Sequence, residues 1–286
     1  LEGKPPEFKQ GFAAKVKEVT EVLGLSNDKF IRTTSPEHKA AAQEFWRRCN
    51  AAGDIYKKQY KIKYCVGCEL EKTDSELEHG KCPLHPTLEI QTIDEENYFF
   101  KLSKYQDQLL AFYESNENFL VPRFRLNEMI SLIEHEGLQD FSISRLKTKM
   151  PWGVEVPDDN EQVMFVWFDA LVNYISTLGW PKDEDTYSTF WPGTQFAGKD
   201  QVRQQAVMWQ AMLLSAKLPM TKQIFIHGFL SIDGQRISKS LGNVVSPFDL
   251  VEKYGQDATR YLMLRHVNPY EDTDVSWNKF TEWYNA

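Results

Sequence analysis

The sequence predicts an α/β fold that contains a parallel β-sheet. Apolar, strand-like runs cover residues 163–168, 195–197 and 223–229, and each is followed by a helix or a turn. The helix expected after Gly198 carries Val202, Ala206, Trp209, Leu213 and Ala216 on one face. A strand, a helix and a second strand in this order are typical of βαβ units, in which the two strands run in the same direction.

Two helices are predicted before these strands. Residues 8–23 carry apolar side chains at helical spacing, and Gly24 ends the run. The next helix begins with Ser35 as its N-cap and Pro36 in its first position, and it is stopped by Gly53.

Further helices are predicted in the middle and at the end of the chain. Helical patterning covers residues 110–138, and two more helices are expected to start near Ser246 and Asp257. Between Gly53 and residue 93 the sequence is polar and rich in turn residues, which indicates a small inserted module.

Composition excludes several classes of protein. The chain of 286 residues is 26% charged and 42% apolar and has a net charge of −8, which is too apolar for a disordered protein. Charged residues interrupt every apolar run, so we expect no membrane-spanning helix, and there is no secretory leader pattern at the start. The acidic balance argues against a protein that coats nucleic acid. It leaves open a local basic patch at residues 57–63, for which a solvated face is the simpler interpretation.

Three cysteines and a histidine form a metal-ligand pattern. Their spacing is C-x2-C-x13-C-x2-H, and the residues are Cys65, Cys68, Cys82 and His85. Three thiolates and one imidazole complete a tetrahedral structural Zn²⁺ site with no position for a catalytic water. The alternatives are incidental cysteines or a degenerate site. The fourth cysteine, Cys49, lies on the apolar face of the second predicted helix and is interpreted as a packing residue.

Residues 234–243 form a loop suited to phosphates. The loop holds two cationic residues and two hydroxyls within five positions, flanked by glycines. Lysine and arginine charges, hydroxyls and backbone N–H groups bind polyphosphate oxygens. By composition alone, a solvated turn remains an equal alternative.

The Arg-Ile-Ser-Lys-Ser run of this loop resembles the Lys-Met-Ser-Lys-Ser signature of class I aminoacyl-tRNA synthetases. The neighbouring text His227-Gly228-Phe229-Leu230 and Leu241-Gly242-Asn243-Val244-Val245 resembles the methionyl-tRNA synthetase family, and the resemblance extends over essentially the whole chain. Other matching segments are Phe30-Ile31-Arg32-Thr33-Thr34, Gly53-Asp54-Ile55-Tyr56, the cysteine–histidine pattern and Glu95-Glu96-Asn97-Tyr98-Phe99.

This resemblance implies an activity and a set of site residues. The family forms methionyl-adenylate from methionine and ATP, with Mg²⁺, and transfers the methionyl group to tRNA. Lys239 and Arg145 match catalytic positions. The implied ATP-binding residues are Arg236, Ser238, Lys239, Ser240, His227, Gly228 and Asp200, and the implied methionine-binding residues are Trp167, Ala170, Tyr174 and Gln205.

Two positions depart from the family pattern. Gln205 stands where the family commonly has His; it keeps hydrogen-bonding capacity but does not titrate near neutrality. Leu171 stands where other members carry Pro, which we interpret as tolerable variation. For the methionine-pocket positions, plain core aromatics are the alternative interpretation.

The resemblance also implies a domain organisation. Residues 1–55 correspond to the helical end of the first Rossmann half, 56–93 to a zinc-binding connective module, 94–233 to the second half of the catalytic domain, and 234–286 to the signature loop and stem-contact helices. The family's His-Ile-Gly-His signature, which lies before the matching region, and its anticodon-binding domain have no counterpart among these residues. We therefore expect an internal portion of a synthetase that lacks activation activity when isolated.

Two further expectations and two competing functions complete the prediction. We expect a cytoplasmic location, because free thiols suit a reduced compartment, and a monomer or a chain that pairs in trans with the missing N-terminal segment. The competing functions are a non-catalytic zinc-containing fragment that binds tRNA or another protein, and another class I aminoacyl-tRNA synthetase.

Overall fold

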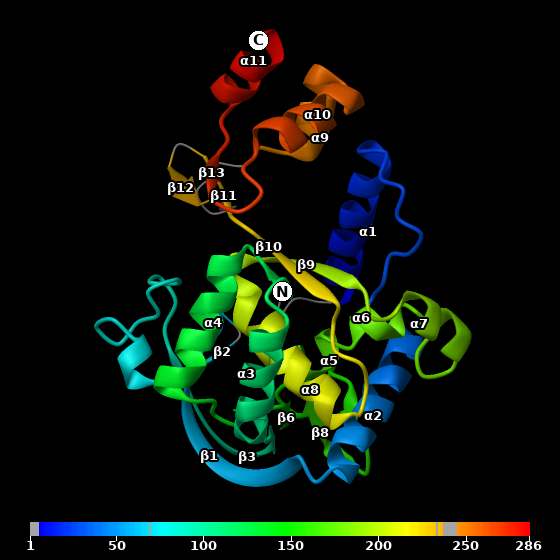
Figure 1. Cartoon of the computed structure of the whole chain (residues 1–286), viewed down its shortest axis with the longest axis vertical. Coiled ribbons are helices and arrows are strands. Elements are labelled where there is room, and N and C mark those ends of the chain that lie inside the picture. Colours follow the sequence, from blue (N-terminus) through cyan, green and yellow to red (C-terminus); the bar gives the residue numbers. More distant parts are fainter. Residues whose placement is uncertain (1–5, 69, 233, 237–244) are drawn as a thin grey trace. The chain divides into compact units, whose positions relative to one another are not determined.

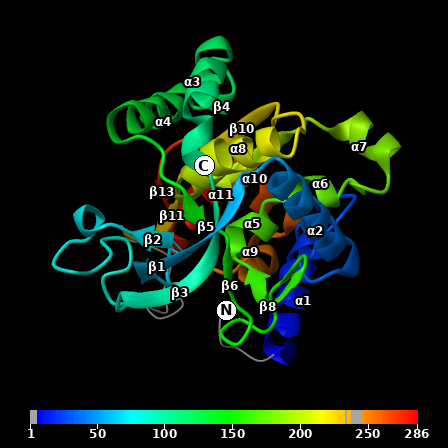
Figure 2. The same cartoon turned by 90° about the horizontal axis from the view of Figure 1, so that it is seen from below.

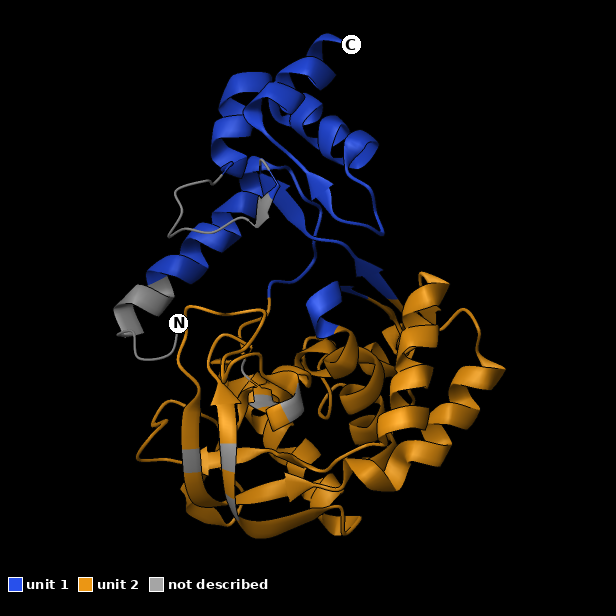
Figure 3. Cartoon of the chain, turned by 90° about the vertical axis from the view of Figure 1, so that its left-hand side faces the viewer, with its two compact units in different colours: residues 1–30, 196–201, 225–286 blue, residues 31–195, 202–224 orange. Residues whose placement is uncertain are grey.

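The computed structural model describes residues 6–68, 70–232, 234–236 and 245–286. The chain forms two compact units (Figure 3). Unit 1 comprises residues 1–30, 196–201 and 225–286, and unit 2 comprises residues 31–195 and 202–224. These units divide the chain at points other than the boundaries of the four predicted segments.

Helix α2 (Pro36–Ala51) in unit 2 follows its sequence signals. The Ser35 hydroxyl accepts a hydrogen bond from the backbone N–H of His38 at 3.2 Å, and Pro36 occupies the first helical position. Phe45 and Cys49 on its inner face are fully buried, and the Phe45 ring stacks on Trp209 at 5.5 Å between ring centroids. Cys49 therefore packs in the core, as predicted.

A long antiparallel ribbon follows α2. Strand β1 (Ile55–Cys65) pairs with β3 (Gln91–Phe100) along almost its whole length, and the four-stranded sheet has the order β2-β1-β3-β5 (Figure 2). The short strands β2 (Leu70–Lys72) and β5 (Phe141–Ser142) lie at its two edges. The prediction of only short, turn-rich structure up to residue 93 was wrong for this ribbon, because lysines and glutamines on both faces hide the apolar alternation that marks a strand.

Three of the four lysines of residues 57–63 lie next to acidic side chains, which come from this ribbon and from neighbouring elements. Lys57 Nζ lies 2.8 Å from Asp159 Oδ2, and Lys63 is paired with Asp74. Lys61 stands directly opposite Asp94 on the neighbouring strand. The basic run in the sequence therefore does not form a uniformly basic surface in the fold.

The segment predicted as one helical stretch over residues 110–138 is two helices. They are α3 (Gln106–Ser115), which follows the short turn η2 (Leu102–Tyr105), and α4 (Arg123–Glu136). Strand β4 (Leu120–Val121) and Pro122 separate them. Proline has no N–H and fixes its own φ, so it starts α4 rather than continuing α3.

The predicted strand over residues 163–168 is correct only in its first part. Strand β8 (Asp159–Met164) ends at Met164, and residues Val166–Ala170 form helix α5. Strand β8 pairs antiparallel with β6 (Ser144–Leu146) and β7 (Glu155–Val156), so it is not part of the parallel sheet. A short apolar run has the same sequence pattern whether it forms a buried strand or a buried helix. Helices α6 (Asn173–Ser176) and α7 (Glu184–Phe190) follow.

The predicted βαβ unit is present. Strands β9 (Thr194–Gly198) and β10 (Gln223–His227) belong to one sheet with the order β4-β10-β9. They are joined by the short turn η3 (Lys199–Gln201), a π-helical turn (Gln204–Met208) and helix α8 (Trp209–Ser215). Figure 1 labels the two strands and α8. A helical crossover of this kind connects parallel strands.

Unit 1 is built mainly from helices. These are α1 (Pro6–Val22), α9 (Pro247–Tyr254), α10 (Gln256–His266) and α11 (Trp277–Asn285). Its short strands are β11 (Leu230–Ile232), β12 (Gln235–Arg236) and β13 (Thr273–Asp274). The core contains Ile232, Leu250, Tyr254, Leu262, Val275 and Phe280.

One capping hydrogen bond and one long-range hydrogen bond stabilise the helices of unit 1. Helix α9 starts at Pro247, next to Ser246 as predicted, and the Ser246 hydroxyl caps it by accepting a hydrogen bond from the backbone N–H of Phe248 at 3.2 Å. The Gln256 side chain donates to Val22 O at 2.9 Å and so attaches the end of α1 to α10. Helix α11 was not predicted. Within the described part of the chain, no helix combines the length and the apolar content that crossing a membrane requires.

Asp54, at the junction of α2 and β1, is the centre of a buried hydrogen-bond network. The side chain is 1% exposed and accepts hydrogen bonds from Lys104 Nζ at 2.6 Å, from the Tyr105 hydroxyl and from Ser215 Oγ at 2.8 Å. Burial alone raises the pKa of Asp54, but the three donors outweigh it and hold the pKa below its ordinary value.

Replacing this carboxylate is expected to destabilise the fold in a pH-dependent way. Asp54→Ala leaves two buried hydroxyls without their acceptor, so we expect a loss of about 3–5 kcal/mol at pH 7. A lowered pKa stabilises the folded state above the ordinary Asp pKa of ~3.9, and this stabilisation is lost as the pH falls through the lower folded value.

The measurement is urea unfolding of both proteins at pH 7 and at pH 3.5, where the difference should shrink. Asp107→Asn, on the exposed side of α3, is the matched control and should change stability by less than about 0.5 kcal/mol. A difference that is equal at both pH values would contradict an ionised Asp54.

Candidate functional site

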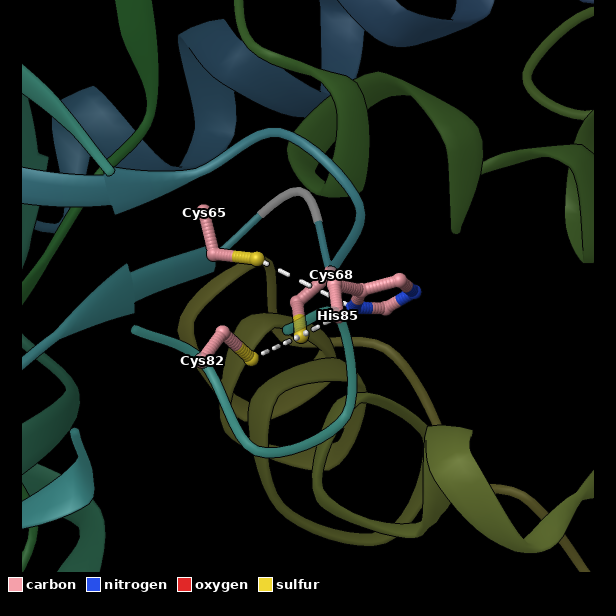
Figure 4. A group of neighbouring side chains, drawn as sticks. All are labelled: Cys65, Cys68, Cys82 and His85. Atoms are coloured by element: carbon pink, nitrogen blue, oxygen red, sulfur yellow. Dashed lines mark hydrogen bonds between the residues drawn. The ribbon is translucent and has the colours of Figure 1, made fainter. Parts of the chain in front are cut away.

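The predicted metal ligands converge at one point (Figure 4). Cys65, Cys68, Cys82 and His85 offer ligand atoms that all lie within 4.8 Å of one another. Cys68 Sγ lies 3.5 Å from Cys82 Sγ and 3.3 Å from His85 Nδ1, and Cys65 Sγ lies 3.8 Å from the same nitrogen. A tetrahedral zinc with Zn–S bonds of ~2.3 Å separates its sulfur ligands by about 3.8 Å, so these distances fit the ion.

Two turns of the chain bring the ligands together. Cys65 is the last residue of β1, and the turn that follows returns Cys68 to the same side. Cys82 and His85 form an antiparallel bridge, in which the His85 N–H donates to Cys82 O at 3.0 Å. Each half of the pattern is thus a tight turn that holds its own two ligands.

The chemistry of the donor set also fits a divalent cation. All four cysteines of the chain are free thiols, and three of them lie in this cluster. Burial and the neighbouring sulfur atoms of Cys82 and Cys65 raise the pKa of the Cys68 thiol to about 12. Three thiolates at this separation repel one another unless a cation lies between them, which is the role that zinc plays in such sites.

Gly67 leaves the space that the His85 ring occupies. A Cβ atom at this position would lie 2.4 Å from His85 Cγ. We expect Gly67→Ala to displace the imidazole and to weaken zinc binding by about 10- to 100-fold, a loss similar to that seen when the orientation of a ligand is disturbed. Competition with a chromogenic chelator measures this affinity. Gly80→Ser is the control. Gly80 has a φ of +77°, but a Cβ atom added there would meet nothing within 4 Å, so this variant introduces backbone strain without a clash and should retain the metal.

A second candidate site is a cavity beside α5 in unit 2. Its volume is about 190 Å³, and its walls are mainly apolar and aromatic. Residues from five parts of the chain form it, among them Leu70, Leu102, Phe141, Phe165, Trp167, Phe168 and Met208. An apolar cavity of ~150 Å³ accepts a molecule as large as benzene, so this cavity is large enough for an apolar amino-acid side chain.

Polar and charged side chains lie at the edge of this cavity. They include Lys72 and Glu76 from the cysteine–histidine module and Arg203 from the start of the crossover helix. The Trp167 indole N–H is buried, and no described residue accepts a hydrogen bond from it. An aromatic wall with an unused donor is typical of a ligand pocket that is already formed.

Two predicted methionine-binding residues are in direct contact. Gln205 Nε2 donates to the Tyr174 hydroxyl at 2.7 Å, while Gln205 Oε1 is buried and has no donor among the described residues. Trp167 and Ala170 lie on the short helix α5, with Trp167 in the cavity wall. The structure therefore brings Trp167 to the cavity and pairs Tyr174 with Gln205.

Arg145 is a buried arginine close to the same cavity. Its side chain donates from Nη1 to Ser142 Oγ at 2.7 Å and to Ser144 O at 2.9 Å. The guanidinium lies 3.8 Å from the centre of the Phe165 ring, and both Phe165 and Ser142 line the cavity. No described residue accepts from Nη2, and no carboxylate of the described residues forms an ion pair with Arg145. A buried cation without a counter-ion is suited to hold an anion.

Three predicted ATP-binding residues lie in unit 1. Gly198 leaves room for Asp200 and His227: a Cβ atom there would lie 2.8 Å from Asp200 Oδ1 and 3.7 Å from His227 Cε1. Gly228 lies against the backbone of Glu271, 2.2 Å from the position of a Cβ atom, so no larger residue fits. Asp200 and His227 are thus neighbours at the ends of β9 and β10.

The other ATP-binding residues fall largely outside the described part of the chain. Ser238, Lys239 and Ser240 belong to residues 237–244, which the structure does not describe. The backbone of Arg236 is part of β12, where it pairs with Ser231, and its side chain is not described.

Sequence reasoning missed four residues that line the cavity. Lys72 and Glu76 lie in the cysteine–histidine module, far in sequence from the aromatic lining residues around Trp167. Arg203 and Met208 lie five positions apart on one helix. An α-helical pattern does not place residues five apart on one face, so periodicity gave no signal for the second pair.

The chain is similar to known synthetases along its whole length. The family model described as tRNA synthetases class I (M) matches residues 2–92 and 88–286. The methionine–tRNA ligase of Nostoc sp. is 44% identical over 99% of this chain and 54% of its own length, and the chloroplastic/mitochondrial enzyme of Arabidopsis thaliana is 44% identical over 99% and 46%.

Solved structures agree with this result. The chain matches the methionyl-tRNA synthetase of Mycobacterium tuberculosis in complex with methionyl-adenylate, with a TM-score of 0.91 and 38% identity over 99% of this chain and 56% of that one. The chain thus spans about half the length of the relatives that it matches. Its mixed α/β architecture with a parallel strand pair is the class I catalytic fold, and the chain belongs to the methionyl-tRNA synthetase family of the class I tRNA synthetases.

Proposed function

We propose that this chain is the methionine-activating region of a methionine–tRNA ligase. The reaction is the ATP-dependent formation of methionyl-adenylate, followed by transfer of the methionyl group to methionine tRNA. The observation that carries the proposal is the aromatic cavity beside Trp167 with the buried Arg145 behind its wall, in a chain 44% identical to methionine–tRNA ligases.

The cavity suits the side chain of methionine. A thioether is soft and polarizable and makes favourable contacts with aromatic rings, which Trp167 and its neighbours supply. The Trp167 indole N–H has no acceptor among the described residues, so it is available to donate to the methionine sulfur, which is a weak hydrogen-bond acceptor. Ala170 lies on the same short helix as Trp167, and Tyr174 and Gln205 offer polar groups to the amino acid.

Activation requires positioning and charge stabilisation rather than covalent help from the protein. A methionine carboxylate oxygen forms a bond to the α-phosphorus of ATP, and the bond to the bridging oxygen breaks as pyrophosphate leaves with its Mg²⁺. Arg145 and Lys239 neutralise the carboxylate and the phosphates. Asp200, His227 and Gly228, together with Arg236, Ser238 and Ser240 of the signature loop, bind the nucleotide.

The cysteine–histidine cluster has a structural role in this proposal. Cys65, Cys68, Cys82 and His85 would hold Zn²⁺, which fixes the module and leaves no open position for a reacting group. Free thiols in a zinc site suit a reducing compartment, so we place the protein in the cytoplasm.

The test is methionine-dependent ATP–pyrophosphate exchange by the full-length protein that contains these 286 residues. Methionine should support exchange at least 100-fold better than leucine, isoleucine, valine or cysteine. Exchange driven best by another of these amino acids would assign the chain to a different class I synthetase. Absence of exchange with any of them, together with tRNA binding, would support a non-catalytic protein instead.

A further inference from the structure

The helix between β9 and β10 contains a π-helical turn. Over Gln204–Met208 the backbone pairs five residues apart, with the Trp209 N–H donating to Gln204 O, and all five residues of the turn are buried. Such turns are rare, and they persist where other groups stabilise them. The change of register leaves backbone carbonyl groups without their α-helical donors, so neighbouring side chains have to donate hydrogen bonds to them.

Two buried side chains satisfy carbonyl groups of this turn. Gln210 Nε2 donates to Gln205 O at 2.8 Å, and the Tyr113 hydroxyl of α3 donates to Ala206 O. Gln210 and Tyr113 are both fully buried. A buried carbonyl that loses its only donor costs free energy, so each of these bonds favours the π-helical over the α-helical geometry.

Both the oxygen and the nitrogen of the Gln210 side-chain amide form hydrogen bonds with Thr221. The Thr221 N–H donates to Gln210 Oε1 at 3.0 Å, and Gln210 Nε2 donates to Thr221 Oγ1 at 3.0 Å. The Thr221 hydroxyl then donates to Gln195 Oε1 at 2.9 Å. These three side chains are at most 3% exposed, and they connect the π-turn to the segments that lead into β9 and β10.

The π-turn decides which side chains reach the cavity. Arg203 and Met208 both line it, although they are five residues apart. In an α-helix two such residues point about 140° away from each other, whereas a π-turn places them one above the other. The same turn directs Gln205 to the Tyr174 hydroxyl at 2.7 Å. A return to α-helical geometry would turn Met208 or Arg203 away from the cavity.

We propose that Gln210 and Tyr113 are positioning residues for methionine binding. They act through the carbonyl oxygens of Gln205 and Ala206, and so hold Gln205 and Met208 in the orientation that the amino acid requires. This inference rests on the proposed function, since the affected quantity is the affinity for methionine.

Two variants of the full-length protein test the proposal. Gln210→Met keeps the volume of the side chain but loses its hydrogen bonds, and Tyr113→Phe loses only the hydroxyl. We expect the KM for methionine in ATP–pyrophosphate exchange to rise about five- to tenfold in each, with the KM for ATP and kcat changed by less than twofold.

Two comparisons separate positioning from general stability. Thr221→Ser retains the hydroxyl that links Gln210 to Gln195 and should behave as wild type, whereas Thr221→Val should raise the KM for methionine. In a Gln205→Ala background, Gln210→Met should raise this KM by no more than about twofold. Gln210 is proposed to act by orienting Gln205, and the Gln205 side chain is already absent in this background.

The outcomes are distinguishable from those of the proposed function. Absence of methionine-dependent exchange in the wild-type protein overturns the proposed function, and the positioning roles with it. With an active wild type, an unchanged KM for methionine in both Gln210→Met and Tyr113→Phe overturns the positioning roles alone. A fall in melting temperature with that KM unchanged overturns them too, because it shows a purely structural contribution.

Discussion

Cys68→Ser is expected to abolish the proposed zinc binding and to unfold the segment between β1 and β3 while the surrounding helices stay folded. The variant removes one of four ligands that converge within 4.8 Å. Structural zinc sites in small modules contribute on the order of 10–16 kcal/mol of apparent binding free energy, so loss of a thiolate removes the main source of order.

The segment has little else to keep it folded. Among the described residues between Val66 and Ile90, only Cys82 is buried. Such a small module buries too little apolar surface to be stable by itself. Helix α2, in contrast, has Phe45 and Cys49 in the core of unit 2, away from the cluster.

Metal analysis and amide hydrogen exchange measure the two parts of this expectation. Zinc content should fall from one equivalent per chain to near zero, and protection should be lost at residues 66–90 only. Cys49→Ser is the matched control, because Cys49 is a buried cysteine outside the cluster, and it should retain the metal. Equal zinc content in Cys68→Ser and wild type would falsify the assignment of the site.

Lys239→Ala is expected to lower the rate of ATP–pyrophosphate exchange by about 10²- to 10³-fold, the usual loss when a group that stabilises transition-state charge is removed. The KM for methionine should change by less than about twofold, since the proposed amino-acid site lies at Trp167 and Tyr174. The expected role of Lys239 is to neutralise charge on the phosphates while the carboxylate of methionine attacks. A flexible, compact ammonium is suited to follow the phosphates as charge moves to the leaving group.

The experiment compares kcat and both KM values in the full-length protein. Lys222→Ala is the matched control, because Lys222 is an exposed lysine outside the signature loop whose backbone alone bonds to Gly193. It should leave exchange unchanged. A Lys239→Ala protein with the exchange rate of wild type would refute the assigned role.

Local signals predicted much of the fold correctly. Ser35 is an N-cap as predicted, and a helix starts beside Ser246 as predicted, because such start signals depend only on a few adjacent residues. The strand–helix–strand unit around α8 is also confirmed. The ribbon of β1 and β3 was missed, because its pairing partners lie between 27 (Tyr64 and Gln91) and 45 (Ile55 and Phe100) residues apart and its exposed faces carry lysine, glutamine and glutamate.

For the residues proposed to bind methionine, too, the sequence predicted one part and the fold decided another. Trp167, Ala170 and Tyr174 were predicted from the resemblance to the family, and the structure adds that Tyr174 pairs with Gln205. The change from strand to helix at Phe165 depends on what surrounds that apolar run, so sequence alone placed Trp167 on the wrong element.

The sequence by itself identified the cysteine–histidine cluster, the family and the helices that carry clear start signals, because these depend on residue identity and short-range spacing. Only the tertiary structure decided which side chains share the cavity. Lys72, Arg203 and Met208 come to its edge through strand pairing and a π-helical turn that Gln210 and Tyr113 stabilise from outside. These are long-range contacts, whose free energy depends on burial and hydrogen bonding across the fold and leaves no pattern in a local stretch of sequence.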